Sequence, residues 1–351
     1  MPENFDFIQS CPVPILDAQQ VLLAHGGGGT LMHRLLSQLF LPAFANEYLD
    51  EQADGAILRV GDNRLAFTTD GYVVQPLFFP GGDIGTLAVN GTVNDLAMCG
   101  ARPLFLSAGF IIEEGLPMEV LRRVTASMRQ CAIEAGVLLV TGDTKVVEKG
   151  SGDGVFITTS GIGLVAAGVS LSASHARPGD AVILSGPIGN HGIAILTQRA
   201  GLELESTVES DSAPLHTLVE AILGVTLAVR CMRDPTRGGL ASTLNEIATQ
   251  SKVGIAIEEA AIPVDDTVRG ACELLGLDPL YVANEGKLVA VVPAQVAGAV
   301  VAAMRAHPLG AGAAVIGQVR DLHPGLVTMR TAFGTTRVVD MLAGDQLPRI
   351  C

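Results

Sequence analysis

The stretch ARPGDAVILSGPIGNHG, residues 176–192, decides how the chain is divided. It begins with a charged turn and continues as a short apolar strand, a glycine-rich turn and the start of a helix. The residues before it already contain several strands and helices, and at this point the pattern restarts. We therefore expect two domains, each of which mixes helices with strands.

The rest of the chain is organised around this boundary. Residues 23–175 are expected to form an N-terminal domain, and residues 176–338 a C-terminal domain. Residues 1–22 are an N-terminal extension, and residues 339–351 are a flexible tail that carries Cys351. The total of 351 residues agrees with two domains, because single hydrophobic cores stop growing beyond about 250–300 residues.

The composition excludes several classes of protein. A net charge of −14 argues against a nucleic-acid binder and against a basic membrane-surface protein, since both need positive patches. The first residues, MPENFDFIQS, carry acids where a signal peptide would carry lysine or arginine, and no apolar run is long enough to span a membrane. The six cysteines contain no CxxC pair: Cys11, Cys99, Cys131, Cys231, Cys272 and Cys351. They indicate a reduced, cytoplasmic protein.

Two glycine-rich stretches could bind an anion. In HGGGG, residues 25–29, the absence of Cβ atoms would let several backbone N–H groups converge on a phosphate, although a flexible turn before a helix is equally compatible. In DPTRGGL, residues 234–240, a helix start could present N–H groups while Asp234 binds a metal ion. The alternative for the second stretch is an ordinary helix start that is capped by Thr236.

Carboxylates follow or precede several apolar strands. Asp70 ends TTD, Asp143 lies in GDT, Asp95 lies in VND, and Asp54 comes just before a strand. A nucleotide phosphate beside several aspartates would need Mg²⁺, which prefers oxygen ligands. A single aspartate at a strand end is more often a solvated turn residue, so this set is informative only if the fold brings its members together.

Two further stretches contain charged residues beside apolar strands. Lys145 lies two residues after Asp143 and would point to the same face of a continuing strand, where it could hold a phosphate or orient a carbonyl group. NEGK, residues 284–287, offers Glu285, although the tetrapeptide alone favours an ordinary hairpin turn. SGPIGNHG, residues 185–192, is interpreted as a strand-to-helix turn.

Taken in order, HGGGG, TTD, GTVNDLAM, VTGDTKVV, DPTRGG and NEGK resemble the ATP-binding superfamily of aminoimidazole ribonucleotide synthetase and selenophosphate synthetase. The ending PRIC narrows the resemblance to the HypE family of hydrogenase maturation proteins. This resemblance implies a two-domain PurM-like fold. Its N-terminal α+β domain would form a β-barrel in a homodimer, its C-terminal domain would be α/β, and ATP would lie between the domains.

The resemblance also implies an activity and partners. The thiol of Cys351 would receive a carbamoyl group from a HypF-like carbamoyltransferase. ATP would drive the dehydration of this S-carboxamide to a thiocyanate, and the cyano group would pass to iron on a HypC–HypD complex for the [NiFe]-hydrogenase centre. We expect no nucleic-acid partner and no membrane. The place where selenophosphate synthetases carry a reactive cysteine holds His25 and glycines here, which counts against selenium chemistry.

The family's functional positions can be carried over residue by residue. The acidic metal positions fall on Asp54, Asp70, Asp95 and Asp234. Contacts to the nucleotide are expected from Gly26, Gly27, Gly28, Gly29, Asp70, Asn94, Asp95, Gly142, Asp143, Thr144, Thr236 and Gly238. Lys145 and Glu285 match positions beside the modified cysteine. Glu285 would take the amide proton, and Lys145 would steady the oxygen or the transferring phosphoryl group.

The terminal position affects the thiol itself. The α-carboxylate of Cys351 should raise the thiol pKa above its free value of about 8.5, and Arg349 could partly offset this effect. Two other functions would not use the thiol. One is a small-molecule kinase or synthetase of the same superfamily, related to thiamine-phosphate kinase or selenophosphate synthetase. The other is a carrier or scaffold whose tail only docks partners.

Overall fold

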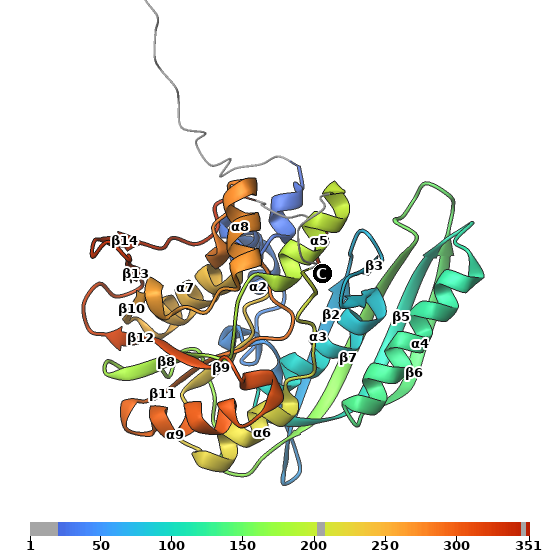
Figure 1. Cartoon of the computed structure of the whole chain (residues 1–351). Helices are drawn as coiled ribbons and strands as arrows, with labels where there is room; N and C mark the ends of the chain where they lie inside the picture. The colour runs from blue at the N-terminus through green and yellow to red at the C-terminus, as the bar shows by residue number, and fades with distance from the viewer. Residues whose placement is uncertain (1–19, 202–207, 345–348) are drawn as a thin grey trace, which may run out of the picture.

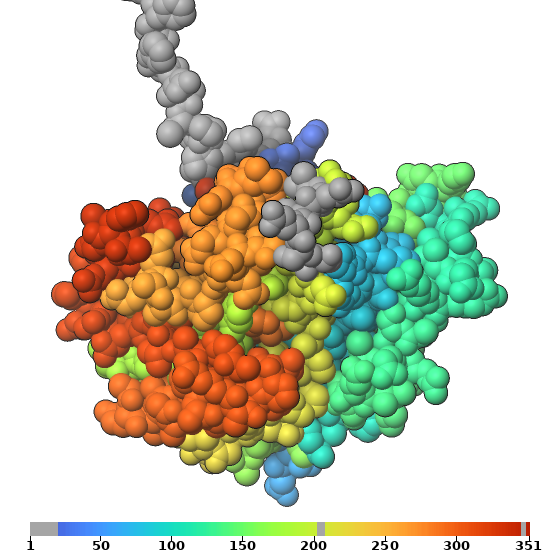
Figure 2. Space-filling view, viewed as in Figure 1, coloured from blue at the N-terminus to red at the C-terminus, as the bar shows by residue number. Residues whose placement is uncertain are grey.

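The computed structural model describes residues 20–201, 208–344 and 349–351. Most of the expected N-terminal extension, including Cys11, and four residues of the expected tail lie outside these ranges. The chain from residue 20 begins with short helical turns, α1 (Thr30–Leu35) and α2 (Leu41–Ala43), which precede the first sheet. In Figure 2 the N-terminal strands and α4 (Met118–Glu134) lie on the right, and most of the C-terminal half lies on the left.

The N-terminal half contains a five-stranded sheet with the order β1-β2-β7-β5-β6. Its strands are β1 (Ala56–Val60), β2 (Asn63–Tyr72), β5 (Ala101–Glu113), β6 (Leu138–Val147) and β7 (Val155–Val165). β5 and β6 are parallel, and the other neighbours are antiparallel. α3 (Ile84–Met98) and α4 pack against one face of this sheet (Figure 1). A two-stranded ribbon, β3 (Phe78–Phe79) and β4 (Gly82–Asp83), leads into α3.

α3 connects the two halves of the molecule, because it packs on the N-terminal sheet and also contacts α6 (His216–Val225) and β9 (Cys231–Arg233). The helix begins at a capping box in which the Asp83 carboxylate accepts hydrogen bonds from the N–H groups of Gly85 and Thr86. Nearly all of its residues are buried. Small residues make this possible: at Gly91 a Cβ atom would collide with the hydroxyl group of Tyr72.

The C-terminal half contains a seven-stranded sheet with the order β14-β13-β10-β12-β8-β11-β9. Its other strands are β8 (Asp180–Leu184), β10 (Gly254–Glu258), β11 (Val289–Pro293), β12 (Ala314–Arg320), β13 (Val327–Arg330) and β14 (Thr336–Val338). Its helices, besides α6, are α5 (Asn190–Ala200), α7 (Gly239–Ser251), α8 (Asp266–Leu275) and α9 (Ala294–Arg305). None of the helices among the described residues is long and apolar enough to cross a membrane.

The strand at the predicted domain boundary, β8, is buried on both faces. Val182 and Leu184 belong to the core beneath α7, whereas Ala181 and Ile183 belong to the core beneath α6 and α9. A strand that is covered by helices on both sides reads as a continuous apolar run, and AVIL is such a run. The sequence of β8 therefore indicates three layers, a sheet with helices on both of its faces.

The expected mixture of helices and strands in both halves is confirmed. The pairing inside the C-terminal sheet is mainly antiparallel, with only β10 and β13 parallel among its described pairs. The alternation of strands and helices in the sequence did not predict this. The barrel would need a second chain, so it stays a prediction.

The described parts of the expected tail are packed against the rest of the chain. Val339 and Leu342 are buried, and the carbonyl oxygen of Leu342 accepts a hydrogen bond of 2.9 Å from the N–H group of Thr30. At the chain end, Ile350 is buried and forms an isolated β-bridge with Val74. The tail thus returns the last residue to the space between the two halves.

Candidate active site

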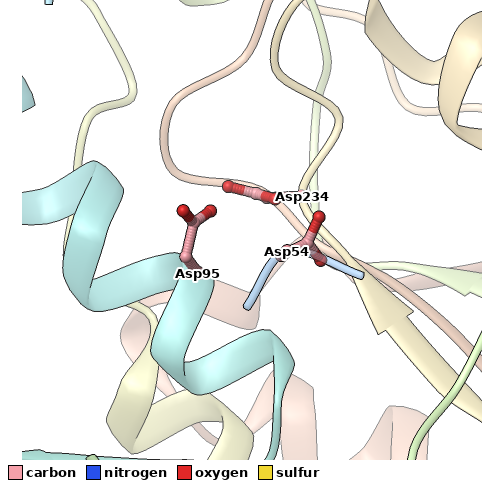
Figure 3. A group of neighbouring side chains, drawn as sticks. All are labelled: Asp54, Asp95 and Asp234. Atoms are coloured by element: carbon pink, nitrogen blue, oxygen red, sulfur yellow. The ribbon is translucent and has the colours of Figure 1, made fainter. Parts of the chain in front are cut away.

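Three carboxyl groups from distant parts of the sequence meet between the two halves (Figure 3). Asp54 precedes β1, Asp95 lies on α3 and Asp234 follows β9, and one oxygen atom of each lies within 4.8 Å of the others. Burial and the charge of Glu246 raise the pKa of Asp54 to about 6. Burial and the other carboxylates of the group raise the pKa of Asp234 to about 7 and that of Asp95 well above its ordinary value. A divalent cation would neutralise this group, and carboxylate oxygens are the ligands that Mg²⁺ and Ca²⁺ prefer.

A second layer of side chains holds the acidic group. The Arg233 side chain forms an ion pair of 2.8 Å with Asp54 and one of 2.7 Å with Glu246. The Thr68 hydroxyl group lies 2.8 Å from a carboxylate oxygen of Asp95. Glu246 also contacts the imidazole ring of His33 at 3.1 Å. These contacts fix the direction of two of the three carboxyl groups.

The acidic group lies in a cavity of about 340 Å³. One part of its wall is apolar and comes from the segment before the first sheet: Met32, Leu36, Leu41 and Leu49. Gly28, Asp70 and Thr236, three of the residues that the sequence predicts to contact a nucleotide, also line it. Asp70 is not one of the three clustered carboxyl groups, and its nearest cation is Arg237 at 3.6 Å. A neighbouring cavity of about 220 Å³ is lined by Gly26, Gly27 and Gly238, among other residues.

The glycine loop, residues 26–29, packs closely against backbone. At Gly28, where φ is +72°, a Cβ atom would lie 2.5 Å from the carbonyl oxygen of Arg237. At Gly29 a Cβ atom would collide with the carbonyl oxygen of Leu342. Glycine is therefore required here for close packing between the loop, the DPTRGG turn and the beginning of the tail.

Cys351 lies where the two cavities meet, because it lines both. Glu285 lines the larger of these cavities with it, and its carboxyl group lies close enough to the thiol to affect the ionisation of the thiol. Burial raises the pKa of this thiol far above its ordinary value, and the carboxyl groups of Glu285 and Asp70 raise it further, while Arg237 acts in the opposite direction. The docked thiol is therefore protonated at neutral pH and is a poor nucleophile.

The cation beside the thiol is Arg237, and the expectation that Arg349 would serve there is wrong. The guanidinium group of Arg349 instead forms an ion pair of 2.6 Å with Asp153. Arg237 also lines both cavities. The sequence did not predict this role, because in DPTRGG only the aspartate and the glycines matched a known kind of anion or metal site.

Glu285 is held in place by its neighbours in the sequence and by a loop before α6. Its backbone N–H group donates to the Asp211 carboxylate at 3.0 Å, and the same carboxylate forms an ion pair of 3.0 Å with Lys287. A Cβ atom at Gly286 would collide with the carbonyl oxygen of Asp211. Burial and the nearby acids Asp234 and Asp70 raise the pKa of Glu285 well above its ordinary value. The NEGK stretch therefore holds a carboxyl group in a fixed position beside the thiol.

Asn94 does not face the cavity, contrary to its expected contact with the nucleotide. Its Oδ1 atom accepts a hydrogen bond from the N–H group of Leu215, and its Nδ2 atom donates to the carbonyl oxygens of Ala213 and Glu285. The side chain is buried and fully engaged with backbone, so its role is to hold the loop before α6 against α3.

The VTGDTKVV motif also lies away from the two cavities that one chain forms. Gly142, Asp143, Thr144 and Lys145 are exposed on β6, the edge strand at the far side of the sheet from β2. Lys145 forms an ion pair of 2.7 Å with Asp143, which lowers the pKa of that carboxyl group. Three strand spacings separate β2 from β6, which corresponds to roughly 14 Å. The expectation that these residues lie beside Cys351 or line the nucleotide cavity is not met within one chain.

The sequence did not predict the roles of several further residues near the site. Arg233 and Glu246 orient the acidic group, and His191 contacts the chain end. Arg233 stands directly before the quoted DPTRGG motif, so it could have been considered. His191 and Glu246 carry no signal in a single sequence, because their roles depend on elements that meet only in the folded chain.

Two family models match the chain. AIR synthase related protein, N-terminal domain, matches residues 52–165, and AIR synthase related protein, C-terminal domain, matches residues 177–327. The chain is also 56% identical over 331 residues to carbamoyl dehydratase HypE of Azotobacter vinelandii, covering 94% of this chain and 97% of the relative. It is 47% identical over 336 residues to carbamoyl dehydratase HypE of Escherichia coli K12, covering 94% and 99%.

Solved structures agree with these relatives. A chain from a crystal structure of a HypE–HypF complex superposes with a TM-score of 0.84 and 49% identity, covering 88% of this chain and 99% of that one. A crystal structure of HypE in complex with ATP gives a TM-score of 0.80 and 52% identity, covering 95% and 100%. Thiamine monophosphate kinase from Aquifex aeolicus shares the fold alone, with 17% identity, a TM-score of 0.64 and coverage of 88% and 99%. The chain, with an acidic cluster, a glycine loop and a cysteine at its very end, belongs to the HypE family of hydrogenase maturation proteins.

Proposed function

We propose that this chain is an ATP-dependent carbamoyl dehydratase that acts on its own C-terminal cysteine during hydrogenase maturation. Its relatives of 47–57% identity carry this name, and a similar solved structure holds ATP. One observation from the structure supports the proposal most: the Cys351 thiol lies against Glu285 at the junction of two cavities, one of which contains the acidic group. The product would be a thiocyanate, the source of a cyanide ligand.

The acidic group fits Mg²⁺. Burial and neighbouring carboxylates raise the pKa values of Asp54, Asp95 and Asp234, and a bound divalent cation would compensate their negative charges. Mg²⁺ bound there would neutralise a nucleotide triphosphate near Cys351. The residues that would hold the ion are these three aspartates, and Asp70 could join them from the same cavity.

The dehydration needs a leaving group and a base. ATP would supply the phosphoryl group that turns the carboxamide oxygen into phosphate, which departs with its bonding electrons. The amide nitrogen loses both of its protons, one to solvent as the oxygen is phosphorylated and one as the carbon–nitrogen triple bond forms. Glu285 would accept the second proton once Mg²⁺ has neutralised Asp234 and Asp70, the acids that raise its pKa. Arg237, which lines both cavities, would stabilise negative charge on the oxygen that leaves. The sulfur keeps its bond to the carbon throughout.

The protonation state of the docked thiol indicates that carbamoylation and dehydration take place at different positions of the tail. Its raised pKa makes it a poor nucleophile where it lies, so it should accept the carbamoyl group outside this pocket. The S-carboxamide is neutral and can return without burying a new charge beside Glu285. We infer that a HypF-like protein loads the thiol and that an iron-carrying HypC–HypD complex receives the cyano group. The similar HypE–HypF structure supports the first partner.

We also infer a homodimer in the cytoplasm. β6 is a free edge strand with exposed apolar residues, including Val140 and Val146, and the outer face of the sheet exposes Phe67 and Phe105. A second copy would cover these groups. It could also place Lys145 of the partner subunit near the nucleotide, which would restore the role expected for that lysine. The five described cysteines are free, as expected in a reducing compartment.

The small-molecule kinase alternative is not favoured, because such an enzyme would have no use for a terminal thiol beside its general base. A scaffold without catalysis would not need Asp211 and Lys287 to hold Glu285 in place beside the thiol.

Replacing Glu285 with Gln tests the proposal. The substitution keeps the shape of the side chain and removes the base, so ATP binding should stay normal while dehydration of the carbamoylated chain slows by about 100-fold or more. Single-turnover dehydration and ATP binding by calorimetry measure the two effects. Glu273→Gln, at an exposed position on α8, is the matched control and should leave both unchanged. Normal dehydration by Glu285→Gln would refute the role of this base.

A further inference from the structure

The last residues of the chain are held through their backbone. Just beyond the end of β2, the N–H group of Val73 donates to a terminal carboxylate oxygen of Cys351 at 2.9 Å, and the N–H group of Gln75 donates to the carbonyl oxygen of Arg349 at 3.3 Å. Ile350 bridges to Val74 between them and buries its side chain. The chain end is thus added to the molecule as a short antiparallel strand.

Two side chains of α5 complete this attachment from the other side. The Nε2 atom of His191 lies 2.7 Å from the carbonyl oxygen of Ile350, and an Nη2 atom of Arg199 donates to the carbonyl oxygen of Arg349 at 2.8 Å. Arg199 also donates to the carbonyl oxygen of Gln75, at 3.0 and 2.7 Å, so it ties the tail to the strand beside it. α5 runs past the marked chain end in Figure 1.

The hydrogen bonds of His191 define its role. A carbonyl oxygen can only accept, so Nε2 carries the proton that it donates to Ile350. The Ser210 hydroxyl oxygen already accepts from the N–H group of Ser212 at 3.2 Å, and the hydroxyl group can therefore donate to Nδ1 of His191 at 2.8 Å. The imidazole ring is fully buried and packs edge-on against Phe79. The only described acceptor of its Nε2 proton is the tail.

A fully buried donor whose partner is a backbone carbonyl would be left unpaired when the tail leaves, which is costly. This cost favours the docked tail. For His191 the sequence predicts only a place in a strand-to-helix turn, SGPIGNHG. The turn is present, and it places the histidine at the second residue of α5, facing the last strand of the chain.

All of these contacts are made to main-chain atoms, and none is made to the sulfur of Cys351. A group attached to the sulfur therefore leaves every one of them available. We propose that His191 and Arg199 form a main-chain clamp, defined by these two residues, that holds the C-terminal tripeptide in the groove beside β2 and so positions Cys351 at Glu285 whether its sulfur is free or modified. The statement on the modified sulfur rests on the proposed function, whereas the statement on the free thiol does not.

The free thiol provides a direct test that needs no carbamoyl donor. The full-length chain is treated with iodoacetamide, and alkylation of the C-terminal peptide is followed by mass spectrometry. Docking buries Cys351, so the rate reports the undocked fraction. Losing one ordinary hydrogen bond changes an equilibrium constant by about five-fold. We expect about a five-fold faster alkylation in Arg199→Ala, and at least as large an increase in His191→Phe, which keeps a ring but no donor.

Controls separate positioning from general destabilisation. Gln198→Ala changes the exposed residue next to Arg199 and should alkylate at the wild-type rate. His191→Gln retains an N–H donor and should recover part of the docking. Arg199 lies at the exposed end of α5, so its variant keeps the test decisive if the buried His191→Phe variant does not fold. Wild-type alkylation rates in both Arg199→Ala and His191→Phe would overturn the clamp.

A second readout tests the modified tail. In the carbamoylated chain without ATP, Arg199→Ala should speed removal of the C-terminal residue by a carboxypeptidase by about the same factor, because this removal also reports the undocked fraction, and ATP affinity should stay unchanged. Faster alkylation of the free thiol together with unchanged removal of the carbamoylated residue would overturn the clamp for the modified sulfur. Absence of dehydration in the wild-type chain would refute the proposed function, and the alkylation result would still decide the clamp for the free thiol.

Discussion

Three carboxyl groups within 4.8 Å of one another, Asp54, Asp95 and Asp234, oppose folding when all are charged. Their pKa values in the folded chain are raised above the ordinary value of about 3.9. A raised pKa means that the contribution of these groups to stability is fully present at low pH. It is lost as the pH rises through the folded values, about 6 for Asp54 and about 7 for Asp234.

This repulsion predicts that Asp95→Asn stabilises the metal-free chain. In a chelating buffer, the melting temperature of Asp95→Asn should exceed that of the wild type, and the difference should grow between pH 5 and pH 8. Mg²⁺ at pH 8 should raise the melting temperature of the wild type more than that of the variant. Asp62→Asn, in an exposed turn, is the control and should show no such pH-dependent difference. A difference that shrinks with rising pH would contradict this electrostatic account.

The burial of a residue in the folded chain cannot be read from its short sequence motif, and this limited the prediction of the site residues. Asp95 and Asp143 both looked like candidates in short polar motifs, but Asp95 lies on a helix between the two halves and Asp143 lies on a free edge. Nothing local distinguishes them. Cys351 and Glu285 were found through family motifs. His191 was not, because its partner is 159 residues away.

Among the elements, β8 and α3 were the most predictable. The apolar run of β8 matches burial on two faces, and the small residues of α3 match close packing on two sides. The antiparallel pairing of the C-terminal sheet could not be predicted in the same way. Strand direction depends on where each connection crosses, and local periodicity contains no information about that.

The packing of α3 predicts opposite effects for two glycine-to-alanine substitutions in helices. In Gly91→Ala the new methyl group would collide with the buried Tyr72 side chain, so the free energy of unfolding should fall by about 1–3 kcal/mol. In Gly298→Ala, on α9, a Cβ atom meets nothing within 4 Å, and the variant should gain about 0.5–1 kcal/mol from helix propensity. Urea unfolding of both variants measures this contrast. A stabilised Gly91→Ala would show that α3 packs less closely than described.

The exposed edge strand predicts the oligomeric state. Val140 is 58% exposed on β6, and a lysine there should prevent a second chain from covering this edge without unfolding the monomer. We expect a dimer for the wild type and a monomer for Val140→Lys by light scattering after gel filtration, with unchanged circular dichroism. Leu274→Lys, 72% exposed on α8, is the control and should remain dimeric. A dimeric Val140→Lys would exclude this edge from the interface.

For the whole molecule, the site exists only because the two halves and the chain end meet. The acidic group draws one carboxyl group from before β1, one from α3 and one from after β9, and the thiol arrives from residue 351. The order of motifs along the sequence identified this family. The docked position of the tail, and the role of α5 in holding it, required the folded chain.

The most direct test of the account follows the mass of the intact chain through the two stages of the proposed cycle. The full-length protein is loaded by a carbamoyl donor enzyme, Mg-ATP is then added, and the C-terminal peptide is mapped after each stage, with Cys351→Ser in parallel. We predict a gain of one carbamoyl group followed by a loss of one water on the wild-type terminal peptide, and no loss of water from Cys351→Ser. Water loss that maps to another peptide, or that persists in Cys351→Ser, would contradict the claim that the terminal thiol carries the reacting group.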